Sequence, residues 1–279
     1  MAIIAFWSQE TKETGQTLSQ VALTTHMAIE HNYRILSIST TFKDTTMESC
    51  YWNLEKENAF LKNLTNTPQV GLESGVEGLV KVIKSNKTST NIIANYAKIV
   101  FKDRLDILCA PKTKDYNEYS DIASSYPEIL QIADRAYDLV FIDVSNRLPE
   151  EQSKRILEMA DIIIVNMTQK LQIIDDFIKL KEENDFFKKN NILINIGRYD
   201  KFSKYNVKNI TRYIKQKRDI LVTPYNTLFF ESCSEGKVAE FFLRLRRLDP
   251  DDRNAVFVAE ESRTAKEIIY KMQELQIKV

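Results

Sequence analysis

An apolar run at the start of the chain leads through a polar loop directly into a helical pattern. Residues 2–7 (AIIAFW) predict a buried strand, and the apolar residues from Leu18 to Met27 follow the spacing of a helix that begins near Gly15. A buried strand, a polar loop and a helix opening with a small residue form the layout of a phosphate-binding loop, in which backbone N–H groups surround an anion. A plain structural turn between a strand and a helix is the alternative.

The loop keeps only part of the residue pattern that binds phosphate. That pattern is G-x-x-x-x-G-K-[ST], and the corresponding residues here run from Glu10 to Thr17 (ETKETGQT). Gly15 and Thr17 match the second glycine and the metal-facing hydroxyl, whereas Glu10 and Gln16 replace the first glycine and the lysine. Backbone approaches phosphate closely only where side chains are absent, and the whole chain has just six glycines. The stretch is therefore either a phosphate loop without its chemistry or a bare turn.

Apolar segments alternate with helical patterns along the rest of the chain. Further strands are expected at residues 33–39, 105–109, 138–143, 161–165, 192–195 and 220–222. Helices are expected at 47–64, 75–85, 126–137, 150–159, 173–183 and 207–217 and in the C-terminal part, while 91–101 is ambiguous. Continuously apolar strands between amphipathic helices predict a mostly parallel sheet covered on both faces. We expect one doubly wound α/β domain over residues 1–279, with the strand ending near Trp7 central and the strand ending at Asp143 beside it.

Composition excludes several classes of function. Lys+Arg and Asp+Glu number 39 each, so no overall field favours nucleic acid or an anionic membrane. The only histidines are His26 and His31, which makes a His-based metal site or a Ser-His-Asp triad unexpected. Three widely spaced cysteines indicate reduced thiols in a cytosolic protein. No apolar run approaches the roughly 18–20 residues of a membrane helix, and no basic segment precedes the first apolar run, so we expect neither a membrane span nor a signal peptide.

Four segments in the second half of the chain carry a resemblance to a known family. They are residues 139–143 (LVFID), 160–165 (ADIIIV), 192–195 (ILIN) and 222–226 (VTPYN), the last followed by 235–237 (EGK). In this order, with helix-sized spacers, they resemble the ParA/MinD superfamily of ATPases, phosphate-loop proteins with a deviant Walker A sequence. The opening residues 5–8 (AFWS) are most similar to the TadZ/CpaE branch of that superfamily, which is associated with pilus assembly and secretion.

The resemblance implies a nucleotide site where the strands end. It places the nucleotide-binding positions at Lys12, Gly15, Gln16, Thr17, Asp143, Asn195 and Pro224, of which Thr17 and Asp143 face the metal. Asp143 would act through water and magnesium, and Asn195 would read adenine. Each position also has a plainer interpretation: Asp143 as a helix cap or loop acid, Asn195 as a turn residue, and Lys12 as an exposed lysine between Glu10 and Glu13.

Departures from the family pattern predict weak or absent hydrolysis. Gln16 stands where the family has the lysine that neutralises the transferring phosphate. The signature lysine position falls on Thr11, with Lys12 one place away, and the carboxylate that orients the attacking water falls on Ser39. Losing one oriented group costs on the order of 100- to 1000-fold in rate. We therefore expect a dimeric localisation or scaffold factor for a membrane-associated assembly of the pilus or secretion type, with ATP and magnesium as the cofactors that the resemblance implies.

Two other functions remain open at this point. One is a working ATPase of the same fold, with Lys12 and other side chains in place of the missing residues. The other is a DNA partition or conjugation factor, against which the neutral charge argues. Glu10 and Glu13 lie at a helix N-terminus, where carboxylates are favourable, and we expect them to occupy the place of a phosphate and weaken nucleotide binding. The expected location is cytoplasmic, with attachment to the inner face of the membrane left open.

Overall fold

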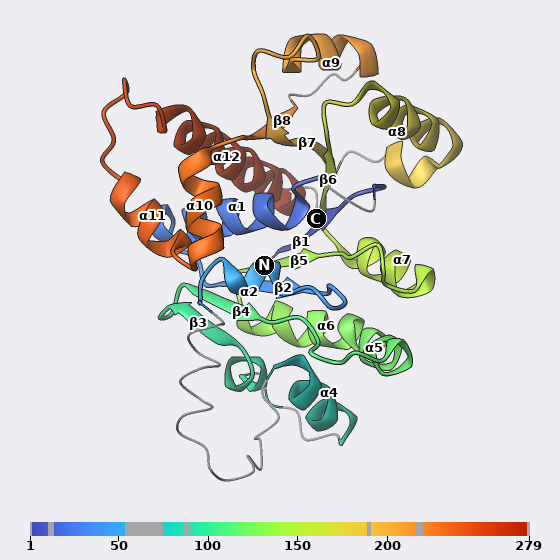
Figure 1. The fold of residues 1–279 in the computed structure, drawn as a ribbon. Coiled ribbons are helices and arrows are strands. Elements are labelled where there is room, and N and C mark those ends of the chain that lie inside the picture. Colours follow the sequence, from blue (N-terminus) through green and yellow to red (C-terminus); the bar gives the residue numbers. More distant parts are fainter. Residues whose placement is uncertain are drawn as a thin grey trace.

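An eight-stranded sheet forms the centre of the computed structural model, which describes residues 2–10, 14–53, 75–85, 89, 91–188, 191–215 and 220–277. The strands are β1 (Ala2–Trp7), β2 (Ile35–Ser39), β3 (Lys98–Phe101), β4 (Leu105–Leu108), β5 (Leu139–Asp143), β6 (Ile162–Met167), β7 (Ile192–Tyr199) and β8 (Leu221–Pro224). Helices cover both faces of the sheet (Figure 1). The expected single-domain, doubly wound α/β fold is thereby confirmed.

The strand order is β3-β4-β2-β5-β1-β6-β7-β8, and β3 is the one strand of this sheet that runs antiparallel to its neighbour. β1 lies between β5 and β6, which confirms the expected central position of the first strand beside the strand that ends at Asp143. Phe6 and Ser39 both pair with Asp143 in the register of the sheet. The carboxyl ends of β1, β2 and β5 are therefore level, and the residues that follow them share one edge of the sheet.

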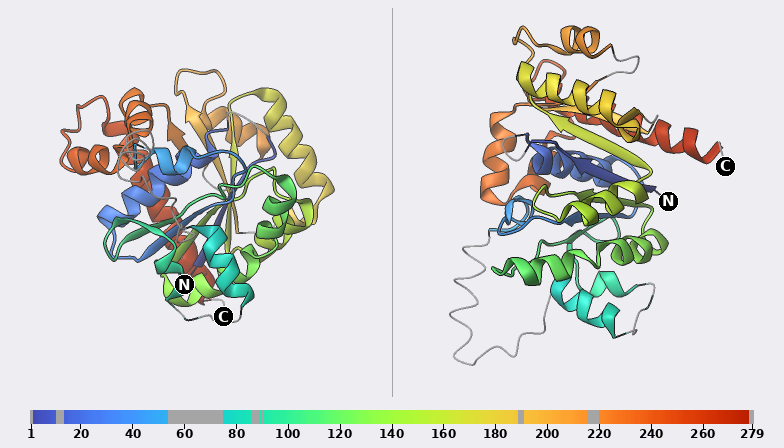
Figure 2. Two further views of the ribbon diagram at one scale, coloured as in Figure 1. Left: turned by 60° about the horizontal axis from the view of Figure 1, so that its bottom comes forward. Right: turned by 90° about the vertical axis from the view of Figure 1, so that its right-hand side faces the viewer.

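Two hydrophobic cores, one on each face, hold the helices to the sheet. Successive side chains of a strand point to opposite faces, so Ile3 and Ala5 of β1 join one core while Ile4 and Phe6 join the other. The second core is covered by α1 (Gln16–Glu30), α2 (Thr46–Ser49), α10 (Thr227–Glu235), α11 (Val238–Leu245) and α12 (Ala255–Ile277). The first is covered by α4 (Val76–Lys84), α5 (Tyr116–Ala123), α6 (Tyr126–Ala136), α7 (Glu150–Met159), α8 (Leu171–Glu183) and α9 (Val207–Ile214). Figure 2 shows the resulting three layers from two further directions.

The fold differs from the expected elements in three places. In the region of the helix expected over residues 47–64, α2 ends at Ser49. The chain turns there, and the Cys50 carbonyl accepts a hydrogen bond from the Val238 backbone N–H at 3.1 Å. Residues 54–74 lie outside the described part. The ambiguous stretch at 91–101 forms a short 3₁₀ helix (Ile92–Asn95) and then β3. The helix α5 was not expected, although the Asp115 carboxylate caps it by accepting hydrogen bonds from two backbone N–H groups.

The last helix, α12, packs against the body of the protein. It contacts α1 and β8, and Ala265, Ile268 and Met272 are buried against them in the second core. The apolar stripe of this helix is therefore a packing surface within the protein. Among the described residues, no helix has both the length and the apolar character that crossing a bilayer requires.

Candidate functional site

The loop between β1 and α1 lies close against the end of β7. Gly15, at the start of α1, has a φ of 70°, in the left-handed region where glycine carries no steric cost. A Cβ atom placed on Gly197 of β7 would lie 2.1 Å from the Thr14 carbonyl oxygen, so only a glycine lets the loop come this near. Two glycines therefore set the position of the loop, one within it and one on the neighbouring strand.

The Gln16 side chain ties the loop to the ends of β1 and β5. Its Nε2 group donates to the Asp143 Oδ1 at 2.6 Å, to the Phe6 carbonyl at 3.0 Å and to the Val144 carbonyl at 3.0 Å. The Thr17 hydroxyl donates to the other carboxylate oxygen of Asp143 at 2.6 Å. Both oxygens of Asp143 thus accept hydrogen bonds from neutral groups of the first helical turn.

Asp143 is a carboxylate removed from water. The residue is 1% exposed, and burial raises the pKa of its carboxyl group to about 6, while the hydrogen bonds from Thr17 and Gln16 act in the opposite direction. Nearby Asp44 adds a smaller upward effect on this pKa. Because Gln16 is uncharged, its amide stabilises the ionised carboxylate less than an ammonium group at the same place would.

Hydroxyl groups, not a carboxylate, follow the end of β2. The Ser39 hydroxyl lies 2.9 Å from that of Thr41, and the Thr40 hydroxyl donates to the Asp143 backbone carbonyl at 2.7 Å. The Ser145 backbone N–H donates in turn to the Thr40 hydroxyl at 2.9 Å. These contacts hold the loops after β2 and β5 together, and they leave no acid at the Ser39 position to orient a water molecule.

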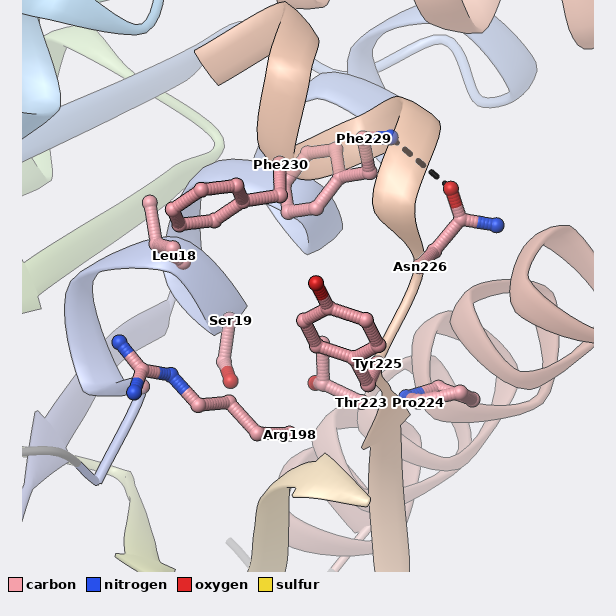
Figure 3. Close-up of a pocket in the computed structure, with 10 residues that line it drawn as sticks. Leu18, Ser19, Arg198, Thr223, Pro224, Tyr225, Asn226, Phe229 and Phe230 are labelled. Carbon is pink, nitrogen blue, oxygen red and sulfur yellow. Dashed lines mark hydrogen bonds between the residues drawn. The ribbon is translucent and has the colours of Figure 1, made fainter. Parts of the chain in front are cut away.

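Two cavities meet at the start of α1. The larger, of about 760 Å³, is lined by the loop, by residues after β2 and by residues after β5, including Glu10, Gln16, Thr17, Lys43, Asp143 and Arg147. The smaller, of about 200 Å³, has largely apolar walls that include Leu18, Ser19, Pro224, Tyr225, Phe229 and Phe230 (Figure 3). Gly15, Leu18, Arg198 and Phe230 line both cavities, so a ligand with a flat apolar part and a charged part could extend from one into the other.

The sequence-predicted site residues are brought together only in part. Gly15, Gln16, Thr17 and Asp143 line the larger cavity, and Pro224 lines the smaller one, as a residue beside a base would. Asn195 is 2% exposed and donates to Asn166 Oδ1 at 2.8 Å and to Thr223 Oγ1 at 3.3 Å. Asn195 lies within β7 and bonds to Thr223, which lines the smaller cavity. Asn195 itself lines neither of the two cavities described above.

The acidic residues of the loop are only partly described. Lys12 and Glu13 lie outside the described residues, so their expected roles are not addressed by the structure. Glu10 lines the larger cavity, and its backbone carbonyl accepts a hydrogen bond from the Asn146 side chain at 2.6 Å. The described side chain that joins the start of α1 to the ends of β1 and β5 is the Gln16 amide.

Three cations that line the larger cavity were not expected from the sequence. Lys43 follows β2, Arg147 follows β5 and Arg198 lies within β7, and each is exposed. Lys43 and Arg198 have φ angles of 56° and 51°, a region that non-glycine residues rarely adopt. Only their place in the sequence could have pointed to these three residues. All three lie at or just beyond the carboxyl ends of strands, where ligands of parallel sheets bind.

The fold is similar to those of solved ParA- and MinD-type ATPases. A ParA family ATPase from Chlorobium tepidum TLS matches with a TM-score of 0.67 at 15% sequence identity, over 92% of this chain and 96% of that chain. The septum site-determining protein MinD from Pyrococcus horikoshii OT3, solved with Mg-ADP, matches with a TM-score of 0.62 at 14% identity, over 97% and 98%. A plasmid partition protein from Borrelia burgdorferi matches with a TM-score of 0.52 at 19% identity, over 87% and 98%. No protein-family model and no curated protein matches the sequence.

The described residues do not fit the hydrolysis of Mg-ATP. A hydroxyl and a carboxylate suited to magnesium are present in Thr17 and Asp143, but they are bonded to each other, and the second carboxylate oxygen is bonded to Gln16. The side chain at the lysine position is neutral, and the Ser39 position carries a hydroxyl. Among the described residues, the Thr17 hydroxyl and both Asp143 oxygens therefore have hydrogen-bond partners within the protein.

Proposed function

We propose that this protein is a ParA/MinD-like localisation or scaffold factor that does not hydrolyse nucleotide efficiently. The observation that carries the proposal is the Gln16 amide, which stands at the lysine position and donates to Asp143, Phe6 and Val144. Phosphoryl transfer depends almost entirely on positioned charge around the transferring group. A neutral amide whose hydrogens are directed at protein acceptors cannot supply that charge.

Similarity of fold supports the localisation part of the proposal. Solved proteins of similar fold include a septum site-determining protein, a plasmid partition protein and a MinC:MinD cell division complex. The resemblance of residues 5–8 to the TadZ/CpaE branch favours a pilus or secretion assembly at the inner face of a membrane. In this proposal the protein acts as a homodimer and binds a protein component of that assembly.

A phosphate-release assay tests the absence of turnover. Purified wild-type protein, Asp143→Asn and a heat-inactivated sample are incubated with Mg-ATP, and all three should release phosphate at the same background rate. Asparagine keeps the volume of the buried aspartate, and circular dichroism verifies that the variant is folded. Turnover by the wild type that Asp143→Asn abolishes would establish a working ATPase and overturn the proposal.

A localisation assay tests the scaffold role separately. Fluorescent fusions of the wild type and of Asp143→Asn are expressed in the native cell. Both should form the same foci at the membrane-associated assembly, because the proposed role uses no turnover. A fusion that instead covers the nucleoid would favour the DNA partition function, and loss of foci in the variant alone would show that the ionisable carboxylate is needed.

A further inference from the structure

The fifteen residues 201–215, which form the loop after β7 and the helix α9, carry positive charge without a neighbouring acid in the sequence. They contain five cations and no aspartate or glutamate, although the chain as a whole has equal numbers of cations and acids. All five cations are exposed, and none forms an ion pair with a described residue. They are Lys201, Lys204, Lys208, Arg212 and Lys215. We call these five residues and Phe202 the basic face.

The cations of α9 lie on one stripe of the helix. Lys208, Arg212 and the C-cap Lys215 are spaced by four and three residues, which places them on the same side. Ile210 and Ile214 lie on the other side and are buried in the first core. Like charges at this spacing repel, and the helix dipole disfavours a cation in the first turn, so the stripe lowers the stability of α9. An anionic surface lying against the stripe would offset this cost.

Phe202 is held in water by a firmly bonded loop. It is 86% exposed, the largest exposed fraction among the large hydrophobic side chains that the structure describes. The Gln169 amide donates to the Asp200 carbonyl at 3.0 Å and to the Tyr205 carbonyl at 2.8 Å, and it accepts from the Asp200 N–H at 2.7 Å. The Phe202 N–H donates to the Asp200 carboxylate at 2.9 Å. The loop thus keeps an apolar ring in water beside the cations, and the ring would gain free energy by leaving water.

The basic face lies at one end of the molecule. Figure 1 shows α9 at the outer end, beyond the sheet edge formed by β7 and β8, and the right-hand view of Figure 2 shows the same arrangement from the side. An end of the molecule can approach a flat surface without a clash from the rest of the chain. The C-terminal helix α12 does not offer such a surface, because Ile268 and Met272 of its apolar stripe are buried in the second core.

We infer that the basic face binds the surface of an anionic lipid bilayer, with Phe202 inserted at the level of the headgroups and the cations against their negative charges. A bilayer supplies both components, because anionic headgroups attract Lys and Arg, and aromatic side chains partition into the interface just below them. Nucleic acid would also neutralise the cations, but a duplex offers no apolar phase for the ring. The inference rests on the proposed function in placing the protein at a membrane, and it uses neither the cavities at α1 nor a nucleotide.

Sedimentation of the full-length protein with lipid vesicles tests the electrostatic part of the inference. The protein should pellet with vesicles of phosphatidylcholine and phosphatidylglycerol and stay in solution with pure phosphatidylcholine, and added salt should weaken the binding. Lys208→Gln combined with Arg212→Gln should weaken binding by about 25-fold, or about fivefold for each cation. The control is Arg244→Gln combined with Arg247→Gln, which removes the same charge from exposed positions at the end of α11 and should leave binding unchanged.

Two substitutions of Phe202 test the insertion of its ring. Phe202→Ser should weaken binding to the anionic vesicles by about tenfold, because the apolar surface that leaves water is lost. Phe202→Trp should keep the binding, since an indole also favours the membrane interface. The fluorescence of this variant should shift to shorter wavelength on anionic vesicles by more than that of the wild type. Circular dichroism verifies that each variant is folded.

Contrary results are distinct from a failure of the proposed function. No binding to anionic vesicles, an equal loss in the α11 control, or unchanged binding by a folded Phe202→Ser would overturn the inference. Binding to duplex DNA that is tighter than to vesicles at equal phosphate concentration, and unaffected by Phe202→Ser, would make the basic face a nucleic-acid surface and overturn the lipid assignment. All these results leave the absence of hydrolysis intact. ATP turnover in the phosphate-release assay would instead overturn the proposed function and leave the vesicle results standing.

Discussion

Replacing Gln16 by methionine removes the donor that joins the loop to Asp143 while keeping an unbranched side chain of similar length. The Nε2 group contacts three acceptors, and the carboxylate oxygen at 2.6 Å belongs to a residue that is 1% exposed. A hydrogen bond to a charged group contributes about 1.5–3 kcal/mol, and a buried acceptor left without its donor adds to the loss. We expect Gln16→Met to lower the free energy of unfolding by about 2–4 kcal/mol.

Urea denaturation followed by circular dichroism measures this change, with Gln131→Met on α6 as the control. Gln131 is exposed, and its side chain forms no hydrogen bond with a described residue, so its replacement should change the free energy of unfolding by less than about 0.5 kcal/mol. In the Asp143→Asn background, Gln16→Met should lower the free energy of unfolding by much less, because the charged acceptor is gone. If Gln16→Met behaves like Gln131→Met, the amide does not hold the start of α1 to the ends of β1 and β5.

The effect of Gln16→Met should also depend on pH. Burial raises the pKa of the Asp143 carboxyl to about 6, and the Gln16 hydrogen bond opposes that rise. Removing the bond raises the pKa further, so the variant suffers most where the carboxyl is ionised. The destabilisation measured at pH 8 should therefore exceed that at pH 5, where the wild-type carboxyl is already largely protonated. Equal losses at both pH values would show that the amide's main partners are the two backbone carbonyls.

Three further predictions concern groups around the site and in the second core. Burial lowers the pKa of His26 from 6.5 to about 4. Between these two values the unfolded chain binds a proton that the folded chain does not. In urea titrations, the free energy of unfolding of the wild type should therefore fall by about 2 kcal/mol between neutral pH and pH 5, relative to His26→Phe. Gly197→Ala puts a Cβ 2.1 Å from the Thr14 carbonyl and should cost about 1–3 kcal/mol, with increased proteolysis of the loop before α1. Gly236→Ala combines a φ of 73° with a Cβ 2.7 Å from the Trp52 backbone, and its melting temperature should fall by several degrees; an unchanged melting temperature would contradict the packing of the Trp52 turn on α10.

The sheet was predictable because its signals are local. Continuous apolar runs identify β1, β5, β6 and β7 without any knowledge of their neighbours, and helix-sized spacers between them dictate parallel pairing. The edge strand β3 runs antiparallel to β4 and none of its residues is buried, so the expectation of buried parallel strands does not describe it. The helix expected at 47–64 is interrupted after Ser49 for a tertiary reason, because the Cys50 carbonyl accepts a hydrogen bond from Val238, nearly two hundred positions away along the chain; residues 54–64 lie outside the described part.

The site was predictable where strand ends alone determine it. Gln16, Thr17 and Asp143 follow neighbouring parallel strands, so their meeting at one edge of the sheet needs only the topology. The position of Arg198 depends on the close approach of the loop to Gly197 and on a left-handed backbone conformation, neither of which a residue pattern encodes. Asn195 is buried because β7 continues beyond it to Tyr199 and its amide donates to Asn166 and Thr223 on the neighbouring strands, which the sequence does not indicate.

The neutral Gln16, at the position where the resemblance places a lysine, bears on switching as well as on catalysis. A ligand shifts a conformational equilibrium only through its different affinity for the two states. A loop lysine that needs phosphate oxygens as partners makes the loop's conformation depend on the nucleotide. The Gln16 amide instead finds its acceptors in Asp143, Phe6 and Val144, so the described loop residues are already joined to the sheet without a ligand. A nucleotide that left these bonds in place would change the conformation of the loop little. This geometry therefore favours a factor whose surface stays constant over one that cycles between nucleotide-dependent states. Hydrogen–deuterium exchange in residues 14–30 should be nearly unchanged by saturating ADP. Strong protection of these residues by ADP would show that the loop still responds to nucleotide.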